Sequence, residues 1–213
     1  MKLRKELPLI TIVLIPFIYL AYIWKTLPKK VPMHWNINGE IDRFGTKFEL
    51  ILIPVLLPLL VYILFLLIPK IDPKNKLKNM GNKYDSFKLI LTIFMSVLAL
   101  MILYFAKNKS FTNPNYIILL IGFLYIIVGN FSKTIRPNYF IGFKTPWTLE
   151  NEIVWKDTHL LVGKLWFIGG LLIIVFSLIL DKKINTYTFI IITSVITIIP
   201  VIYSYLRFKT LTK

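Results

Sequence analysis

The chain alternates between long apolar runs and short polar connections. Six runs approach the roughly 20 apolar residues that a helix needs to cross a bilayer. We expect these spans at residues 7–24, 50–68, 88–106, 116–131, 160–180 and 187–206. The basic start MKLRKE is not followed by a small-residue cleavage site, so we interpret the first run as a retained span and not as a signal peptide. The pattern predicts an all-α fold, a polytopic membrane protein with about six transmembrane helices.

Glycines inside the spans indicate where helices approach one another. Gly122, Gly169 and Gly170 would each permit close contact between helix backbones. No strict GxxxG pattern occurs within a span, so the sequence does not support a dimerisation motif of that kind.

Composition agrees with the membrane interpretation and narrows the chemistry. Of the 213 residues, 56% are hydrophobic, and the mean hydropathy is +0.69. There are no cysteines, which excludes disulfides and thiolate metal sites. The net charge of +16 would suggest nucleic acid as a partner of a soluble protein. Here the lysines flank apolar runs, where they set orientation and contact anionic lipid head groups, so we expect no direct nucleic-acid binding.

The distribution of basic residues predicts the orientation. With Lys164 left out because it lies inside the fifth span, sixteen Lys and Arg fall on the side of the two termini and nine on the other side. By the positive-inside rule both termini are expected in the cytoplasm. We expect a multi-pass membrane protein.

A polar linker, PKIDPKNKLKNMGNKYDSFK, divides the chain. We expect an N-terminal membrane domain at residues 1–72 and a C-terminal membrane domain at residues 73–213. Each has a long loop rich in aromatic and amide residues.

The loop of the first domain contains the stretch VPMHWNINGEID. His34, Glu40 and Asp42 have side chains that can hold zinc, but their spacing matches no established zinc motif. We favour a turn-stabilising or interfacial role for His34, and we expect neither a metal site nor a cofactor.

The loop of the second domain contains GFKTPWTLENEIVWKDTH. Thr148 is the expected N-cap of a short amphipathic helix from about Leu149 to His159, which would lie along the membrane interface or pack back on the helix bundle. Glu152, Trp155 and His159 would then share one face of this helix.

Catalysis is poorly supported by this loop. Glu152 and His159 are two turns apart, about 10.5 Å of rise, which is too far for a direct hydrogen bond. No serine or cysteine nucleophile is evidently paired with His159. Lys164 lies one turn into the fifth span, where we expect it to snorkel or to reach Asp157.

The segment RPNYFIGFKTPWTLENEIVWKDTHLLVGKLWFIGG closely resembles the signature of the SdpI family of bacterial membrane proteins. The family pattern falls on Asn138, Gly142, Lys144, Thr145, Pro146, Trp147, Thr148, Leu149, Trp155, His159 and Gly163. The family often has arginine where this chain has Lys144. The first loop resembles a domain of unknown function often fused ahead of that segment, and its pattern falls on Pro32, His34, Trp35, Asn36, Gly39 and Asp42.

The resemblance implies an immunity protein that protects its cell from a secreted toxin, as in the founding system against the sporulation-delaying toxin. It also implies a second role, in which the protein holds a cytoplasmic transcriptional repressor at the membrane. The C-terminal motif would be the partner-binding surface. Two alternatives stay open, a small transporter or channel and a membrane-bound enzyme, although we expect no enzyme activity.

Overall fold

The computed structural model describes the chain except residues 1–2, 37–39, 73, 78–79, 109–112 and 213. Asn38, Gly39 and Lys78 therefore lie outside the described residues. The chain folds into two compact units. The N-terminal unit comprises residues 1–71 and 84–114, and the C-terminal unit comprises residues 72–83 and 115–213. The sequence placed the division at residues 72 and 73, whereas the third long helix groups with the N-terminal unit.

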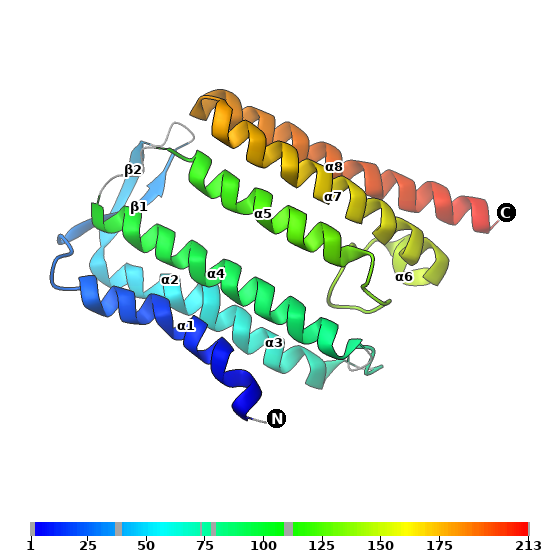
Figure 1. The fold of residues 1–213 in the computed structure, drawn as a ribbon, viewed down its shortest axis with the longest axis horizontal. Helices are drawn as coiled ribbons and strands as arrows, with labels where there is room; N and C mark the ends of the chain where they lie inside the picture. Colours follow the sequence, from blue (N-terminus) through cyan, green and yellow to red (C-terminus); the bar gives the residue numbers. More distant parts are fainter. Residues whose placement is uncertain (1–2, 37–39, 73, 78–79, 109–112, 213) are drawn as a thin grey trace. The chain divides into compact units, whose positions relative to one another are not determined.

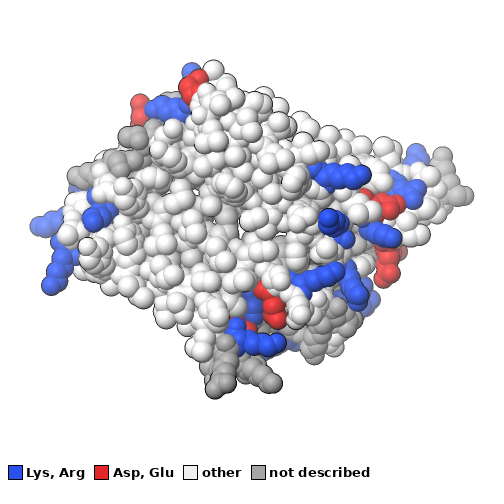
Figure 2. Space-filling view, viewed as in Figure 1, with Lys and Arg blue, Asp and Glu red and all other residues white. Residues whose placement is uncertain are grey.

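Among the described residues, six helices are long and apolar enough to cross a membrane, as predicted. They cover Lys5–Ile23, Lys47–Ile71, Asn82–Asn108, Asn115–Ser132, Glu152–Ile179 and Lys182–Leu211. The prediction of an all-α membrane protein is thus confirmed in its main feature. On the face shown in Figure 2, charged side chains gather over helix ends and loops, and the surface along the helices is uncharged.

The N-terminal unit consists of α1 (Leu3–Ile23), a β-hairpin, a second span and α4 (Asn82–Asn108) (Figure 1). The second span is made of η1 (Lys47–Ile51), α2 (Leu52–Pro54), η2 (Val55–Leu59) and α3 (Leu60–Ile71). The change to a π-helical turn at η2 coincides with Pro58. Proline has no N–H to donate within an α-helix, and a π-helical turn accommodates that loss.

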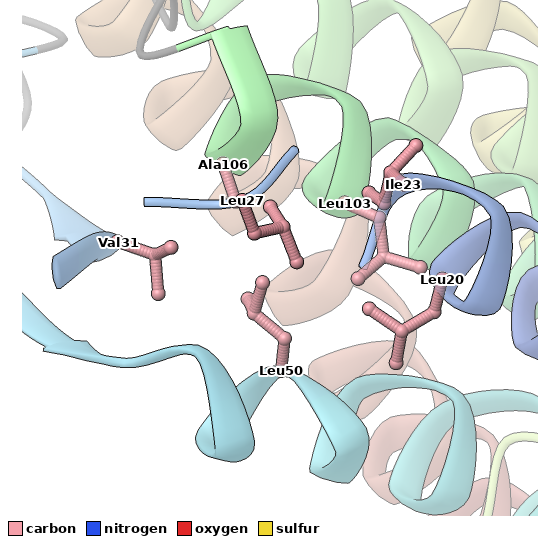
Figure 3. Close-up of a cluster of buried hydrophobic side chains, with 7 residues drawn as sticks. All are labelled: Leu20, Ile23, Leu27, Val31, Leu50, Leu103 and Ala106. Atoms are coloured by element: carbon pink, nitrogen blue, oxygen red, sulfur yellow. The ribbon is translucent and has the colours of Figure 1, made fainter. Parts of the chain in front are cut away.

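The hairpin, β1 (Lys30–Trp35) and β2 (Ile41–Thr46), was not predicted. The strands pair antiparallel from Lys30 opposite Thr46 to Trp35 opposite Ile41, with irregular register around His34. An apolar cluster joins the hairpin to the helices: Leu20, Ile23, Leu27, Val31, Leu50, Leu103 and Ala106 (Figure 3). The hairpin is therefore part of the folded core of this unit.

The C-terminal unit contains α5 (Asn115–Ser132), α6 (Pro146–Glu150), α7 (Glu152–Ile179) and α8 (Lys182–Leu211). Helices α5 and α7 run antiparallel in close contact (Figure 1). The close approach expected from Gly122 and Gly170 is present, since a Cβ on Gly170 would lie 2.7 Å from the Gly122 carbonyl oxygen. A second contact, between Gly129 and Gly163, repeats it seven residues along each helix.

The expected interfacial helix from Leu149 to His159 is corrected by the structure. The loop does hold a short helix, α6, but that helix ends at Glu150. Asn151 then caps α7 by accepting hydrogen bonds from the amides of Ile153 and Val154, and α7 continues unbroken into the span. The fifth span consequently begins at Glu152 instead of Leu160.

Candidate functional site

The loop between α5 and α6 folds around the side chain of Asn138, which is buried. Its Oδ1 accepts from the amides of Phe140 and Ile141 at 2.8 and 2.7 Å, and its Nδ2 donates to the carbonyls of Arg136 and Ile141. An amide side chain can both donate and accept, and this geometry uses both functions. Asn138 therefore acts as the internal brace of the loop.

Gly142 is the point at which this loop lies on α7. Its φ is +123°, a conformation that favours glycine. A Cβ here would lie 2.5 Å from His159 Nε2 and 3.1 Å from the Trp155 ring. The position therefore requires glycine for both conformation and space.

Trp155 and His159 form a buried stacked pair, with ring centroids 4.1 Å apart and an angle of 21° between the ring planes. Trp155 Nε1 donates to the Ile135 carbonyl at 2.9 Å. His159 Nδ1 lies 2.8 Å from the Trp155 carbonyl, which can only accept, and His159 Nε2 lies 3.0 Å from the Phe143 amide, which can only donate. These partners assign a neutral imidazole with its proton on Nδ1.

The two buried threonines of the motif hold α6. Thr145, and not Thr148 as expected, is the N-cap, and its side chain accepts from the Thr148 amide at 3.2 Å. Thr148 Oγ1 in turn accepts a hydrogen bond from the Thr145 amide at 2.8 Å. Thr145 Oγ1 also donates to Ser204 Oγ on α8 at 3.0 Å, and Pro146 occupies the first turn, where a missing N–H costs little.

Lys144, Pro146, Trp147 and Leu149 are the motif residues whose side chains lie near the surface. Lys144 is exposed, and its Nζ donates to the carbonyls of Tyr139 and Phe140. Trp147 is half-buried against Tyr205 of α8, with ring centroids 5.1 Å apart. Exposed Leu149 and Ile153 extend this apolar surface. The motif thus divides into a buried brace and an exposed edge.

The arrangement does not resemble a general acid–base site. Glu152 is exposed at the start of α7, whereas both ring nitrogens of buried His159 already have backbone partners. A contact between Asp157 and Lys164, one of the two arrangements expected for this lysine, is not formed. Asp157 Oδ2 accepts instead from Arg207 Nε of α8 at 2.8 Å, and Lys164 is exposed.

The N-terminal loop motif builds the β-hairpin. Asn36 Nδ2 donates to Glu40 Oε2, and the Glu40 amide donates back to Asn36 Oδ1. His34 Nδ1 lies 2.6 Å from Asp42 Oδ1 between the strands. Pro32 is buried within β1. No group of three metal-ligating side chains occurs among the described residues, since Glu40 is engaged with Asn36 and not with His34 and Asp42.

A buried ionic cluster in the N-terminal unit was not predicted from the sequence. Lys88 Nζ of α4 donates to Glu6 Oε1 of α1 at 2.7 Å, and Tyr62 Oη of α3 donates to Glu6 Oε2 at 3.0 Å. Lys88 and Glu6 are both buried. In the sequence, Glu6 and Lys88 each stand at the end of an apolar run, and they are 82 residues apart. A charged residue at the end of an apolar run is usually assumed to face solvent, which is why the pair was not predicted.

Comparison with known proteins matches both motif regions. Residues 134–204 match the model of the SdpI/YfhL protein family, and residues 11–57 match a domain of unknown function, DUF1648. A relative, Immunity protein SdpI of Bacillus subtilis (strain 168), is 27% identical over 176 residues, which are 82% of this chain and 82% of that protein. No solved structure matches the chain significantly. The resemblance seen in the motifs is confirmed: the chain is similar to SdpI-family proteins over residues 134–204 and to DUF1648 segments over residues 11–57.

Proposed function

We propose that this protein is a bacterial membrane immunity protein that protects its cell from a secreted toxin and has no enzyme activity. The observation that carries the proposal is the similarity to Immunity protein SdpI over 82% of both chains. The family models match both motif regions, at residues 11–57 and 134–204, so the similarity to known proteins includes loops and is not confined to apolar helices, which resemble one another for composition alone. We further propose that both termini lie in the cytoplasm, because the positively charged loops favour that side.

Within the motif, the buried and exposed residues have different roles in this proposal. Asn138, Gly142, Trp155 and His159 brace the loop on α7, because their polar atoms or their lack of a side chain serve internal contacts. Thr145 and Thr148 do the same for α6. The exposed edge of Lys144, Pro146 and Trp147 is left to contact a partner, and tryptophan is among the residue types that most often dominate binding energy at interfaces.

Survival of toxin-sensitive cells tests the immunity function. A Bacillus subtilis strain without its own immunity protein, expressing this chain, is challenged with the sporulation-delaying toxin. We expect survival of cells that express the unchanged chain. Cell death despite normal accumulation in the membrane would contradict the proposal.

The role of the exposed edge is tested in the same strain at matched membrane levels. We expect Trp147→Ala and Lys144→Gln each to reduce survival, because the first removes exposed aromatic surface and the second removes an exposed charge together with its hydrogen bonds to the Tyr139 and Phe140 carbonyls. Lys182→Gln, at the opposite end of α8 from Tyr205, is the matched control and should leave survival unchanged. Equal protection by all three variants would exclude this edge as the working surface.

The side of the membrane on which each loop lies separates the two proposed partners, a cytoplasmic repressor and a secreted toxin. Under the proposed topology, the edge faces the cytoplasm and the β-hairpin faces outside. A cytoplasmic repressor would then meet the edge, whereas a secreted toxin would first meet the hairpin. Loss of protection in His34→Ala but not in Trp147→Ala would place toxin contact at the hairpin and leave the edge for a cytoplasmic partner.

A further inference from the structure

A pocket of about 350 Å³ lies between α5 and α7 in the C-terminal unit, apart from the motif network. Its floor is the contact between Gly129 and Gly163. A Cβ on Gly129 would lie 2.7 Å from the Phe167 amide nitrogen, and one on Gly163 would lie 3.0 Å from the Gly129 carbonyl oxygen. The two backbones touch here without side chains between them, and the longer side chains around this contact form the walls.

The walls combine basic and apolar side chains. Asn130, Lys133 and Lys164 supply the polar groups. Leu160, Phe167 and Ile168 supply the apolar surface, and all three are exposed. A cavity of this composition suits a ligand that carries a negative charge and a hydrocarbon part.

Both lysines are available for an anionic ligand. Neither Lys133 nor Lys164 lies within 4.0 Å of a carboxylate in the described part of the chain. Asp157 does line an adjoining hollow of about 220 Å³ together with Lys164, but its carboxylate accepts from Arg207 at 2.8 Å. The pocket therefore keeps a net positive charge.

The position of the pocket along α7 places its lysines close to the level of the lipid head groups. Helix α7 has 28 residues, about 42 Å at 1.5 Å per residue, whereas the hydrocarbon core is about 30 Å thick. Lys164 lies 15 residues before the end of α7 at Ile179, about 22 Å along the axis. If the hydrocarbon core of the bilayer ends at Ile179, Lys164 lies less than two turns inside the opposite boundary of that core. Its long side chain can then extend to the head groups. Phe167 and Ile168 then lie deeper, at the level of acyl chains.

We propose that this pocket binds an anionic phospholipid, with Lys133 and Lys164 contacting the phosphate, Asn130 hydrogen-bonding the head group and Phe167 and Ile168 packing against an acyl chain. Basic pockets between membrane helices are a known means of binding acidic head groups. The apolar wall favours a lipid over a free phosphate ion, since a free ion gains nothing from Phe167 and Ile168. This inference does not depend on the immunity function.

Lipid binding to the full-length purified chain in neutral detergent tests the proposal. Dioleoylphosphatidylglycerol, dioleoylphosphatidylcholine and inorganic phosphate are titrated separately, and bound lipid is counted by native mass spectrometry. We expect the anionic lipid to bind with at least tenfold higher affinity than the zwitterionic one. Equal affinity for the two lipids, or displacement of the anionic lipid by equimolar inorganic phosphate, would overturn the proposal.

Variants then assign the binding to this pocket. At about 1 kcal/mol per lysine near a lipid surface, Lys133→Gln and Lys164→Gln should each weaken binding about fivefold, and the double variant about 25-fold. Lys156→Gln, an exposed lysine of α7 outside the pocket, should bind as the unchanged chain does. Lys133→Arg/Lys164→Arg keeps both charges and should retain the preference. Unchanged binding in the double glutamine variant, or an equal loss in Lys156→Gln, would mean that the lipid lies elsewhere.

Discussion

At the scale of single residues, the imidazole of His159 shows how tightly the motif is folded on itself. One ring nitrogen donates to the Trp155 carbonyl within α7, and the other accepts from the Phe143 amide across the loop. Ser132 Oγ of α5 also donates to the His159 carbonyl. A residue held from three segments cannot also bind a partner directly without first losing these bonds.

Gly142→Ala tests this packing. The new Cβ would collide with His159 Nε2 at 2.5 Å, and alanine is strained at φ +123°. We expect a loss of about 1–3 kcal/mol in the free energy of unfolding, seen as a lower midpoint of thermal unfolding in detergent.

Gly81→Ala is the matched control, because Gly81 also has a positive φ, +53°, but its Cβ would meet nothing within 4 Å. Gly81→Ala should show the cost of a positive φ without a collision, and hence a smaller loss in the free energy of unfolding. An equal shift in both variants would mean that the contact with His159 contributes nothing.

At the scale of elements, helices in each unit are joined by a different kind of contact. In the C-terminal unit, the glycine pairs bring the backbones of α5 and α7 together, which gains van der Waals contact where lipid offers no hydrophobic driving force. Asn115 of α5 and Asn185 of α8 add hydrogen bonds at the far end of α7, where Asn185 also donates to Ser177.

Adjacent glycines provide a direct test of the backbone contact. A Cβ on Gly170 would meet backbone atoms of α5 at 2.7 and 2.9 Å, whereas a Cβ on Gly169 would meet only the side chains of Ile196 and Ile192, at 3.0 Å or more. Side chains can move aside and backbones cannot. We expect Gly170→Ala to lower the unfolding free energy by about 1–3 kcal/mol and Gly169→Ala by clearly less, measured by thermal unfolding. A larger effect at Gly169 would show that α7 and α8, not α5 and α7, form the tighter contact.

In the N-terminal unit, the buried Glu6–Lys88 pair joins α1 to α4. Removing one partner leaves the other buried charge without its closest counter-ion: within the described ranges, Lys88 keeps only the exposed Asp85 at 3.7 Å, and Glu6 keeps only the Tyr62 hydroxyl. Glu6→Gln or Lys88→Met should therefore each cost about 3–5 kcal/mol. The double variant removes both charges and should cost much less than the sum of the single changes. The measurement is thermal unfolding of all four proteins in one detergent.

The half-exposed Asp157–Arg207 pair is the control for this cycle, and Arg207→Gln should cost about 1 kcal/mol or less. Strictly additive losses at Glu6 and Lys88 would mean that the two charges do not interact.

At the scale of the whole molecule, orientation decides which loop meets which partner. The chain has no cysteine, so a single introduced cysteine reports its own side of the membrane. With a membrane-impermeant maleimide, we expect Asn38→Cys to label in intact cells and Glu150→Cys to label only after permeabilisation. Glu150 is chosen over Asn151 because it is exposed and caps no helix. Labelling of Glu150→Cys in intact cells would reverse the proposed topology.

The sequence by itself determined the number of spans, their approximate positions and the family of the motifs. Hydrophobic length is a property of each segment alone, since a run of about 20 apolar residues must enter lipid whatever its neighbours are. The same reasoning applies to the glycines at 122 and 170, whose small size was visible before their partners were known.

Only the tertiary structure decided which polar residues face inward. Trp155 and His159 were expected on one face of a helix ending at His159 that would lie along the interface or pack back on the bundle, but α7 continues and the loop folds back over them. Likewise, Glu6 and Lys88 became a pair only when α1 and α4 came together. Burial of a charge or an amide depends on a partner far away in the chain, and the pattern of a single segment does not contain that partner.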